Sequence, residues 1–351
     1  MNVSCSGSST KVRDEEVREF VDRSLTQFVC ERGQIAHFQR IESEYQSSCA
    51  VEDLDVSFAD GFRMELVFKN LSPTGLLEDA QRVRPLFLYD PRREIHVYRD
   101  VLWKLEPMPA AYLGSLIDTE QHRYWLLIEK VAGEELYKVG DLSIWCQVAR
   151  WLAGMHGLLE FVPERQELRS VLSQYDAEFY DIWITRAEQF SLKSNATQNF
   201  DHERIRWLAD RYRRIIPVLC GLPSMLIHGE FYASNVLIEE TWPKIRICPI
   251  DWETAALGPA LMDLAALVSG DWTDAEREML TRSYFDALVE PEAVLGRHEF
   301  DHALRCCRLH LAVRWLGWAE NWNPPADHRR DWLAEAVQLA EGIDQCVPSL
   351  T

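Results

Sequence analysis

Three polar residues in the second half of the chain lie next to short apolar runs. Glu230 follows one such run closely, and Asn235 lies five residues after it. Asp251 comes directly after another run, residues 245–250. A carboxylate can orient an attacking hydroxyl group, and amide and carboxylate oxygens are the ligands that magnesium prefers. We therefore expect Glu230, Asn235 and Asp251 to be catalytic, with Asn235 and Asp251 also binding a metal ion, as phosphoryl transfer requires.

The apolar runs around these residues indicate the elements that position them. Residues 225–227 resemble the edge of a strand that leads into the loop of Glu230. Residues 236–238 and 245–250 flank a turn-like tetrapeptide that contains a proline, a pattern that predicts a hairpin. The hairpin would place Asn235 just before its first strand and Asp251 just after its second.

The order His228-Gly229-Glu230, Asn235 and then Ile250-Asp251 resembles the aminoglycoside phosphotransferase and choline kinase family, a branch of the protein-kinase-like fold. Gly258 and Asp263 match the continuation of the family motif, in which the second aspartate is structural. The family motif has aspartate where this chain has Glu230. The resemblance implies a bilobal α+β fold, with a small antiparallel-sheet N-terminal lobe and a larger, mainly helical C-terminal lobe.

This fold implies a boundary near residue 131, with a nucleotide-binding lobe at 1–131 and a catalytic and acceptor-binding lobe at 132–351. Apolar periodicity supports strands and a helix in the first part and helices in the second. The expected strands are 36–48, 54–58, 62–69, 111–117 and 123–131, and the expected helices are 11–30, 92–105, 145–159, 202–219, 273–289, 298–320 and 328–345.

The resemblance also implies a nucleotide site in the first lobe. Lys69 stands on the third expected strand, where the family has a lysine that contacts the nucleotide phosphates, and Glu94 lies on the helix that brings a glutamate to it. Two plainer interpretations stay open: a strand lysine usually lies on a solvated face, and a glutamate in the first turn of a helix is favourable there in any case.

Two further segments of the first lobe are candidates for nucleotide contacts. The segment around Glu129 and Val131 corresponds to the hinge, where backbone groups would bind the nucleotide base. The loop at 45–53 contains no glycine, although glycine would let backbone amides approach phosphates. Ser47 and Ser48 could donate hydroxyl hydrogen bonds there instead. The cofactors implied are ATP, or another nucleoside triphosphate, and Mg²⁺.

Composition restricts the partners. The chain has 351 residues, 37 Lys and Arg, 56 Asp and Glu, and a formal net charge of −19, which argues against nucleic-acid binding. This acidity and the carboxylates of Asp176, Glu178 and Asp181 favour a cationic or amine-bearing acceptor, although such charges also serve solubility alone. Nine scattered cysteines, without a zinc or disulfide pattern, indicate a reducing compartment. No apolar run approaches a membrane span, so we expect a cytoplasmic protein without membrane partners; no pattern bears on its oligomeric state.

The favoured function is ATP-dependent phosphorylation of a hydroxyl group on a small molecule, such as an amino sugar, an amino alcohol or a related metabolite. No P-loop, dinucleotide-binding, zinc-protease or serine-hydrolase motif supports another chemistry. The alternative is a catalytically impaired relative that binds nucleotide or a partner for regulation or assembly. The two functions differ in whether Glu230 supports catalysis. Its side chain keeps the carboxylate of the family's aspartate but is longer by one methylene.

Overall fold

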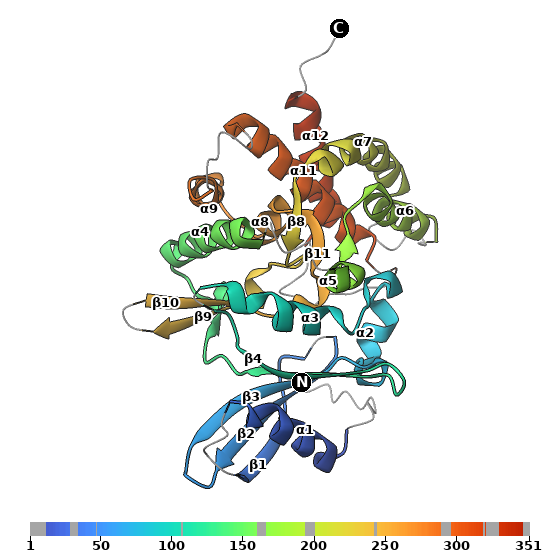
Figure 1. The fold of residues 1–351 in the computed structure, drawn as a ribbon. Helices are drawn as coiled ribbons and strands as arrows, with labels where there is room; N and C mark the ends of the chain where they lie inside the picture. The colour runs from blue at the N-terminus through green and yellow to red at the C-terminus, as the bar shows by residue number, and fades with distance from the viewer. Residues whose placement is uncertain are drawn as a thin grey trace, which may run out of the picture. The chain divides into compact units, whose positions relative to one another are not determined.

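The computed structural model describes residues 12–28, 34–46, 48–106, 108–159, 166–193, 201–241, 244–288, 296–318, 320 and 330–346. The chain forms two compact units (Figure 1). The first consists of Met1–Arg84, Tyr89–Glu134 and Leu237–Glu253, and the second of Pro85–Leu88, Glu135–Val236 and Thr254–Thr351.

The first unit is built on an antiparallel sheet of five strands in the order β1-β2-β3-β5-β4. These strands are β1 (Ile35–Glu42), β2 (Ala50–Phe58), β3 (Arg63–Asn70), β4 (Tyr112–Asp118) and β5 (Arg123–Glu129). Burial alternates along β2, so one set of its side chains forms a core while the other set faces outward. All five strands were expected from the sequence, with different ends.

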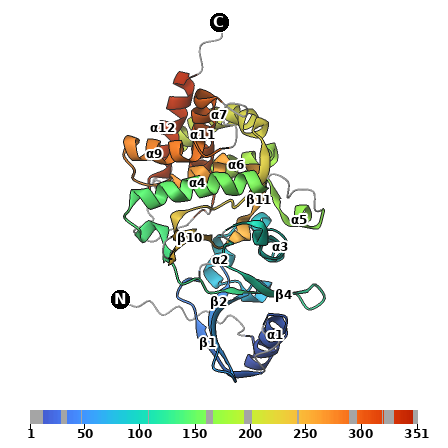
Figure 2. The ribbon, with the colours of Figure 1, turned by 60° about the vertical axis from the view of Figure 1, so that its left-hand side comes forward.

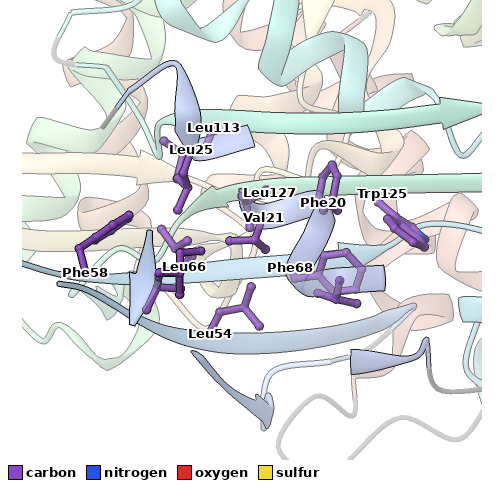
Figure 3. Close-up of a cluster of buried hydrophobic side chains, with 13 residues drawn as sticks. Phe20, Val21, Leu25, Leu54, Phe58, Leu66, Phe68, Leu113, Trp125 and Leu127 are labelled. Atoms are coloured by element: carbon purple, nitrogen blue, oxygen red, sulfur yellow. The ribbon is translucent and has the colours of Figure 1, made fainter. Parts of the chain in front are cut away.

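Helix α1 (Asp14–Thr26) covers one face of this sheet (Figure 3). Phe20 from α1 makes edge-to-face contacts with Phe68 on β3 and Trp125 on β5, at centroid distances of 6.1 and 5.5 Å. Such aromatic contacts add to the hydrophobic stabilisation of a core. Because successive strand side chains point to opposite faces, the placement of Phe68 toward α1 directs Lys69 to the other face.

The ends of two expected elements differ from the structure. The first strand ends at Glu42 rather than near residue 48, because the chain turns at Ser43, whose hydroxyl accepts a hydrogen bond from the Tyr45 amide. β2 already begins at Ala50, so the connecting loop is shorter than 45–53. The helix expected at 92–105 is α3 (Arg93–Asp100), followed by a 3-10 turn.

The second unit is mainly helical and also contains a small sheet (Figures 1 and 2). Its sheet has the order β7-β11-β8, formed by Ser173–Gln174, Ala256–Pro259 and Ser224–Ile227. The helices are α4 (Leu142–Leu159), α5 (Gln166–Val171), α6 (Ala177–Lys193), α7 (His202–Gly221), α8 (Leu261–Leu267), α9 (Asp274–Phe285), α11 (Arg297–Leu316) and α12 (Trp332–Cys346). α11 packs against α6, α7, α8 and α12, which makes it central to this unit. The five later helices expected from the sequence are present as α4, α7, α9, α11 and α12, with different ends.

The expected hairpin is present as β9 (Val236–Thr241) and β10 (Lys244–Pro249), joined by β6 (Glu134–Glu135) in a three-stranded sheet. It places Asn235 before β9 and Asp251 after β10, as the apolar pattern predicts. None of the helices in the described part of the chain has the length and apolarity that a bilayer-spanning helix needs.

His310 on α11 lies fully buried in the helical core. Its Nδ1 lies 2.7 Å from the hydroxyl of Tyr212 on α7, and the ring of Tyr180 meets it edge-on at 4.9 Å. Among the described residues, its Nε2 has no hydrogen-bond partner. Burial, together with the positive charge of Arg314, lowers the pKa of His310 to about 3. The imidazole is therefore neutral in the folded protein.

We expect the free energy of unfolding to fall as the pH drops below about 6.5. The unfolded chain binds a proton on His310 near its ordinary pKa of 6.5, whereas the folded protein resists protonation down to about 3. Between these values the unfolded state holds more protons, so acid favours unfolding by up to about 1.4 kcal/mol per pH unit. Urea unfolding between about pH 7 and about pH 4.5 should show this slope, and His310→Gln should flatten it. An equally steep slope in the variant would contradict the prediction.

Candidate active site

The first unit holds a buried ammonium group between two carboxylates. Lys69, near the end of β3, is 7% exposed. Its Nζ lies 2.7 Å from Oε1 of Glu94 on α3 and 2.8 Å from Oδ1 of Asp251, which follows β10. The structure therefore brings together three residues that the sequence singled out, from positions up to 182 residues apart.

Burial opposes the charge on both Lys69 and Glu94, with different outcomes. Burial lowers the pKa of Lys69, but the carboxylates of Asp251 and Glu94 outweigh it and leave the pKa well above its ordinary value. Burial raises the pKa of Glu94 to about 7, against the opposing effect of Lys69. Among the described residues, Glu94 Oε2 has no hydrogen-bond partner, which fits this rise. Lys69 is thus firmly charged, whereas burial works against the charged form of Glu94.

Hydrogen bonds of Glu253 hold the segment that follows Asp251. Its carboxylate accepts hydrogen bonds from the Ser48 hydroxyl at 2.7 Å and from the Arg84 guanidinium at 2.8 Å. Its backbone carbonyl accepts a third hydrogen bond, from the Arg93 guanidinium at 2.6 Å. Asp251 itself has a φ of +66°, a left-handed conformation that aspartate tolerates better than most residues. A short 3-10 turn and three charge-assisted hydrogen bonds therefore hold the backbone just beyond Asp251.

Glu253 was not singled out from the sequence, although it lies two residues after Asp251 within the recognised motif. Its partners are remote in sequence, so only the folded chain reveals its role. The contact of Ser48 with Glu253 gives this serine a partner within the protein, and Ser47 lies outside the described residues. Binding of nucleotide by these two serines stays a prediction.

The segment expected to act as the hinge is held by an ion pair of the Glu129 side chain. β5 ends at Glu129, whose carboxylate accepts two hydrogen bonds from Arg246, both at 2.7 Å, and one from the Ala111 amide at 3.0 Å. Burial raises the pKa of Glu129, but these hydrogen bonds outweigh it and lower the net pKa. The Glu129 N–H donates to the Ala111 carbonyl. Contact of a nucleotide base with the backbone at Glu129 and Val131 stays a prediction.

In the second unit, a buried carboxylate shapes the loop that carries Glu230. Asp263 on α8 is fully buried, and its two carboxylate oxygens accept hydrogen bonds from the His228 and Gly229 amides, at 2.7 and 2.9 Å. His156 on α4 lies 3.2 Å from the same carboxylate and 2.9 Å from the hydroxyl of Tyr284. Asp263 thus serves the structure of the loop, the role that the family resemblance implies for it, and His156 pairs with its carboxylate.

The turn after His228 requires glycine. Gly229 has a φ of +83°, and a Cβ at this position would lie 2.4 Å from the Thr254 carbonyl oxygen. Any other residue would be both strained and sterically blocked. Beyond the turn, Asn235 Nδ2 donates to the Glu230 carbonyl at 3.0 Å. This bond closes the loop and leaves the amide oxygen as the end of Asn235 that can face a cation.

Arg314 on α11 holds the catalytic candidate Glu230 in place. Its guanidinium donates to the Gly229 carbonyl at 2.8 Å and to the Glu230 carboxylate. Only 3% of Arg314 is exposed, and its charge lies against the indole rings of Trp183 and Trp318, at 5.6 and 5.4 Å from their centroids. Contacts with backbone, carboxylate and aromatic faces leave the guanidinium little freedom. The Glu230 side chain thus has a fixed partner.

Sequence reasoning missed Arg314. The signal that could have found it is a single charged residue within the apolar segment LHLAVRWL, which covers 309–316 of a buried helix. An arginine is almost never fully buried unless it is paired, so such a residue indicates an acidic partner elsewhere in the fold.

The acidic segment near residue 176 has structural contacts. Asp176 accepts a hydrogen bond from the Phe179 amide at 2.8 Å at the start of α6, and Asp181 pairs with Arg213 at 2.9 Å. Two of its three carboxylates therefore take part in helix capping and in an ion pair. Its aromatic residues pack around His310 in the core.

The donor set fits a magnesium nucleotide. Magnesium prefers oxygen ligands and keeps several waters, so an amide and a carboxylate suffice as protein ligands. No group of three or more His, Cys, Asp or Glu side chains suited to a metal ion occurs within the described ranges. Asn235 lies in the second unit and Asp251 in the first, and their joint role as metal ligands stays a prediction.

We expect Asp263→Asn to destabilise the second unit. An asparagine side chain offers one oxygen where two backbone amides need acceptors, and its NH₂ group would face one of those donors. Leaving one buried donor unsatisfied costs about 2 kcal/mol. Urea unfolding should show this loss, and turnover should fall with it. Asp274→Asn, at a fully exposed position on α9, is the matched control and should leave stability within about 0.5 kcal/mol of wild type. Equal stability of Asp263→Asn and wild type would contradict this role.

Solved structures of known proteins resemble this chain in their fold. The GDP complex of aminoglycoside 2'-phosphotransferase-IIIa is similar with a TM-score of 0.54 at 12% identity, over 93% of this chain and 98% of that one. A choline kinase from Streptococcus pneumoniae gives 0.52 at 12% identity, over 94% and 99%. An ethanolamine kinase from Plasmodium vivax gives 0.52 at 11% identity, over 96% and 89%. At such identities the likeness shows the fold alone, and it confirms the expected bilobal kinase-like α+β fold.

Among curated protein sequences, no match to the chain was found. The family model described as the phosphotransferase enzyme family matches residues 81–300. This match covers more than half of the chain and includes Glu94, the Glu230 loop and Asp251. The protein therefore belongs to the phosphotransferase enzyme family, which agrees with the resemblance of its motif to aminoglycoside phosphotransferases and choline kinases.

Proposed function

We propose that the protein transfers a phosphoryl group from ATP, or another nucleoside triphosphate, to a hydroxyl group of a small molecule. The observation that carries this proposal is the buried Lys69 ammonium between Glu94 and Asp251. A buried ion pair is a weak source of stability, because desolvation offsets much of the attraction. In a member of a phosphotransferase family, its better explanation is a cation held ready for anionic phosphates.

Each residue of the site has a distinct part in this proposal. Lys69 binds the nucleotide phosphates, and Glu94 holds its ammonium in place. Asn235 and Asp251 would hold Mg²⁺, and a bound Mg²⁺ would neutralise negative charge on the phosphates. The backbone near Glu129 and Val131 would contact the nucleotide base.

Glu230 is proposed to orient the acceptor hydroxyl and to take its proton. Its carboxylate has the same chemistry as the aspartate of the family, but its extra methylene moves the oxygens outward. A misplacement of about 1 Å can cost on the order of a hundredfold in rate, so the longer side chain must be held. Arg314 supports the proposal because it fixes one carboxylate oxygen of Glu230 and the backbone beside it. Arg314 is accordingly a positioning residue.

An amine-bearing acceptor is the favoured substrate class. Aminoglycosides, choline and ethanolamine, after which the structural relatives are named, all carry amino or quaternary ammonium groups. The net charge of −19 would attract such cations at low ionic strength. Asp176 and Asp181 already have partners within the protein. We therefore attribute this attraction to the net charge and not to the acidic segment.

Nucleotide binding and turnover can be tested separately. Thermal unfolding should shift upward with ATP only when magnesium is present, and Lys69→Met should remove this shift. Glu230→Gln should keep the shift but lose turnover by at least about a hundredfold, because an amide cannot accept the hydroxyl proton. Turnover is measured by ADP release on a panel of amino sugars, amino alcohols, nucleosides and neutral sugars. A wild type that binds MgATP but turns over no acceptor, while Glu230→Asp does, would favour the catalytically impaired alternative.

We expect Arg314→Lys to lower kcat about tenfold or more with little change in the KM for ATP. A lysine keeps the positive charge, but a single ammonium cannot contact the Gly229 carbonyl and the Glu230 carboxylate in the same planar geometry. Arg297→Lys on the same helix, where the arginine pairs with exposed carboxylates, is the matched control and should keep wild-type kcat. Should KM for ATP rise instead while kcat stays constant, Arg314 would not position Glu230.

A further inference from the structure

A cavity of about 650 Å³ lies within the second unit, where α9, α11 and α12 meet. Four arginines line it: Arg277 from α9, Arg305 and Arg308 from α11, and Arg330 just before α12. We call this the arginine cavity. It contains none of the residues assigned to the phosphotransfer site. Four guanidinium groups in one cavity are unusual in a chain with a net charge of −19.

Carboxylates in and around the arginine cavity only partly balance this charge. Glu335 on α12 is 19% exposed and lies 3.3 Å from Arg330 and 3.7 Å from Arg308. Asp271 and Asp274 are fully exposed and lie 3.8 Å from Arg330 and Arg277, respectively. Glu341 also lines the cavity at an exposed position. Four carboxylates thus accompany the four guanidinium groups, but three of them are exposed, and exposed pairs at such separations contribute little.

The positive potential affects Arg308 itself. Burial lowers the pKa of this guanidinium to about 10, and the positive charges of Arg277, Arg330 and Arg305 contribute to the drop, while Glu335 opposes it. A guanidinium ordinarily stays protonated far above this range. The fold therefore holds mutually repelling charges together, which costs stability unless an anion joins them.

Two lining residues also have donors without acceptors. Within the described ranges, the buried Nε of Arg277 and the buried indole Nε1 of Trp272 have no hydrogen-bond partner. Arg277 otherwise donates to the Gly270 carbonyl at 3.1 Å, and Trp272 packs edge-on against Trp145 at 4.7 Å. Buried donors without acceptors are rare in folded proteins and indicate a missing partner. Both atoms are shielded from solvent, so the guanidinium groups that line the open cavity, and not these two donors, are the contacts available to an anion.

We propose that the arginine cavity binds a small molecule that carries phosphate groups. Guanidinium groups bind phosphate oxygens in pairs of parallel hydrogen bonds, and four of them suit an anion with several charges. The volume exceeds that of a phosphate group alone and lies in the range of small-molecule sites, which leaves room for an organic part beside Trp272. The site is separate from the phosphotransfer residues and does not depend on the proposed function.

Calorimetric titration with inorganic pyrophosphate tests this site on the full chain, in EDTA and at low ionic strength. Without magnesium, binding at a magnesium-dependent nucleotide site is suppressed. We expect saturable binding that Arg308→Gln and Arg277→Gln each weaken about tenfold or more, since each removes charge-assisted hydrogen bonds. Arg282→Gln on α9 makes the same change in net charge at an exposed position outside the cavity, and should bind as wild type does. Lys69→Met should also bind normally, which separates this site from the nucleotide site.

The melting temperature of the free protein gives an independent readout. Because the cavity arginines repel one another, Arg308→Gln should melt at or above the wild-type temperature when no anion is present. Pyrophosphate should raise the melting temperature of wild type more than that of this variant. The opposite pattern, a large drop in melting temperature with unchanged pyrophosphate affinity, would assign Arg308 a structural role and overturn the proposal.

Two further anions define the ligand class. Citrate carries several carboxylates in place of phosphates and should bind more weakly than pyrophosphate. Vesicles of phosphatidylcholine with phosphatidic acid should not sediment the protein, because the proposed ligand is a soluble phosphate compound. Tighter binding of citrate, or vesicle binding that Arg308→Gln removes, would overturn this assignment. No pyrophosphate binding, or equal binding by all variants, would overturn the site itself.

Discussion

A buried carboxylate must find hydrogen-bond donors, and Asp263 finds them in the backbone of the loop that carries Glu230. Burial of an ionised group without such partners would cost several kcal/mol, so the loop has one favourable conformation. That conformation requires Gly229, because the Thr254 carbonyl leaves no room for a side chain. The position of the proposed catalytic carboxylate therefore depends on a residue that does not take part in the chemistry.

The same physical principle orders the first unit. Lys69 is buried and charged, so its ammonium requires the carboxylates of Glu94 and Asp251. This requirement links β3, α3 and the end of the hairpin, three elements that share no local sequence signal. In the second unit, the buried guanidinium of Arg314 has the same requirement, and its partners are the Glu230 carboxylate and the Gly229 carbonyl. In each case the cost of burying an unpaired charge, and not proximity in the chain, determines which residues are in contact.

The sequence was informative where chemistry depends on local spacing. The motif around Glu230 and Asn235, the hairpin before Asp251, and the five strands of the first unit follow from apolar periodicity and turn residues. The pairing of Lys69 with Glu94 followed only from the family resemblance. Arg314 lies 84 residues after Glu230, so no spacing rule connects them. Strand ends were also missed: β1 stops at Glu42, where the chain enters a turn that the apolar pattern does not mark.

The positive φ of Asp251 restricts which residues can replace it, independently of its chemistry. Left-handed backbone costs roughly 1–2 kcal/mol for most residues, whereas glycine, asparagine and aspartate adopt it with less strain. A change to alanine would therefore combine loss of the carboxylate with a strained turn, and a β-branched residue would be worse. Asparagine would remove the charge and keep the turn. Asparagine at this position would thus preserve the turn but withdraw one of the two carboxylates that pair with the buried Lys69 ammonium, so the cost would fall on the ion pair and not on the backbone.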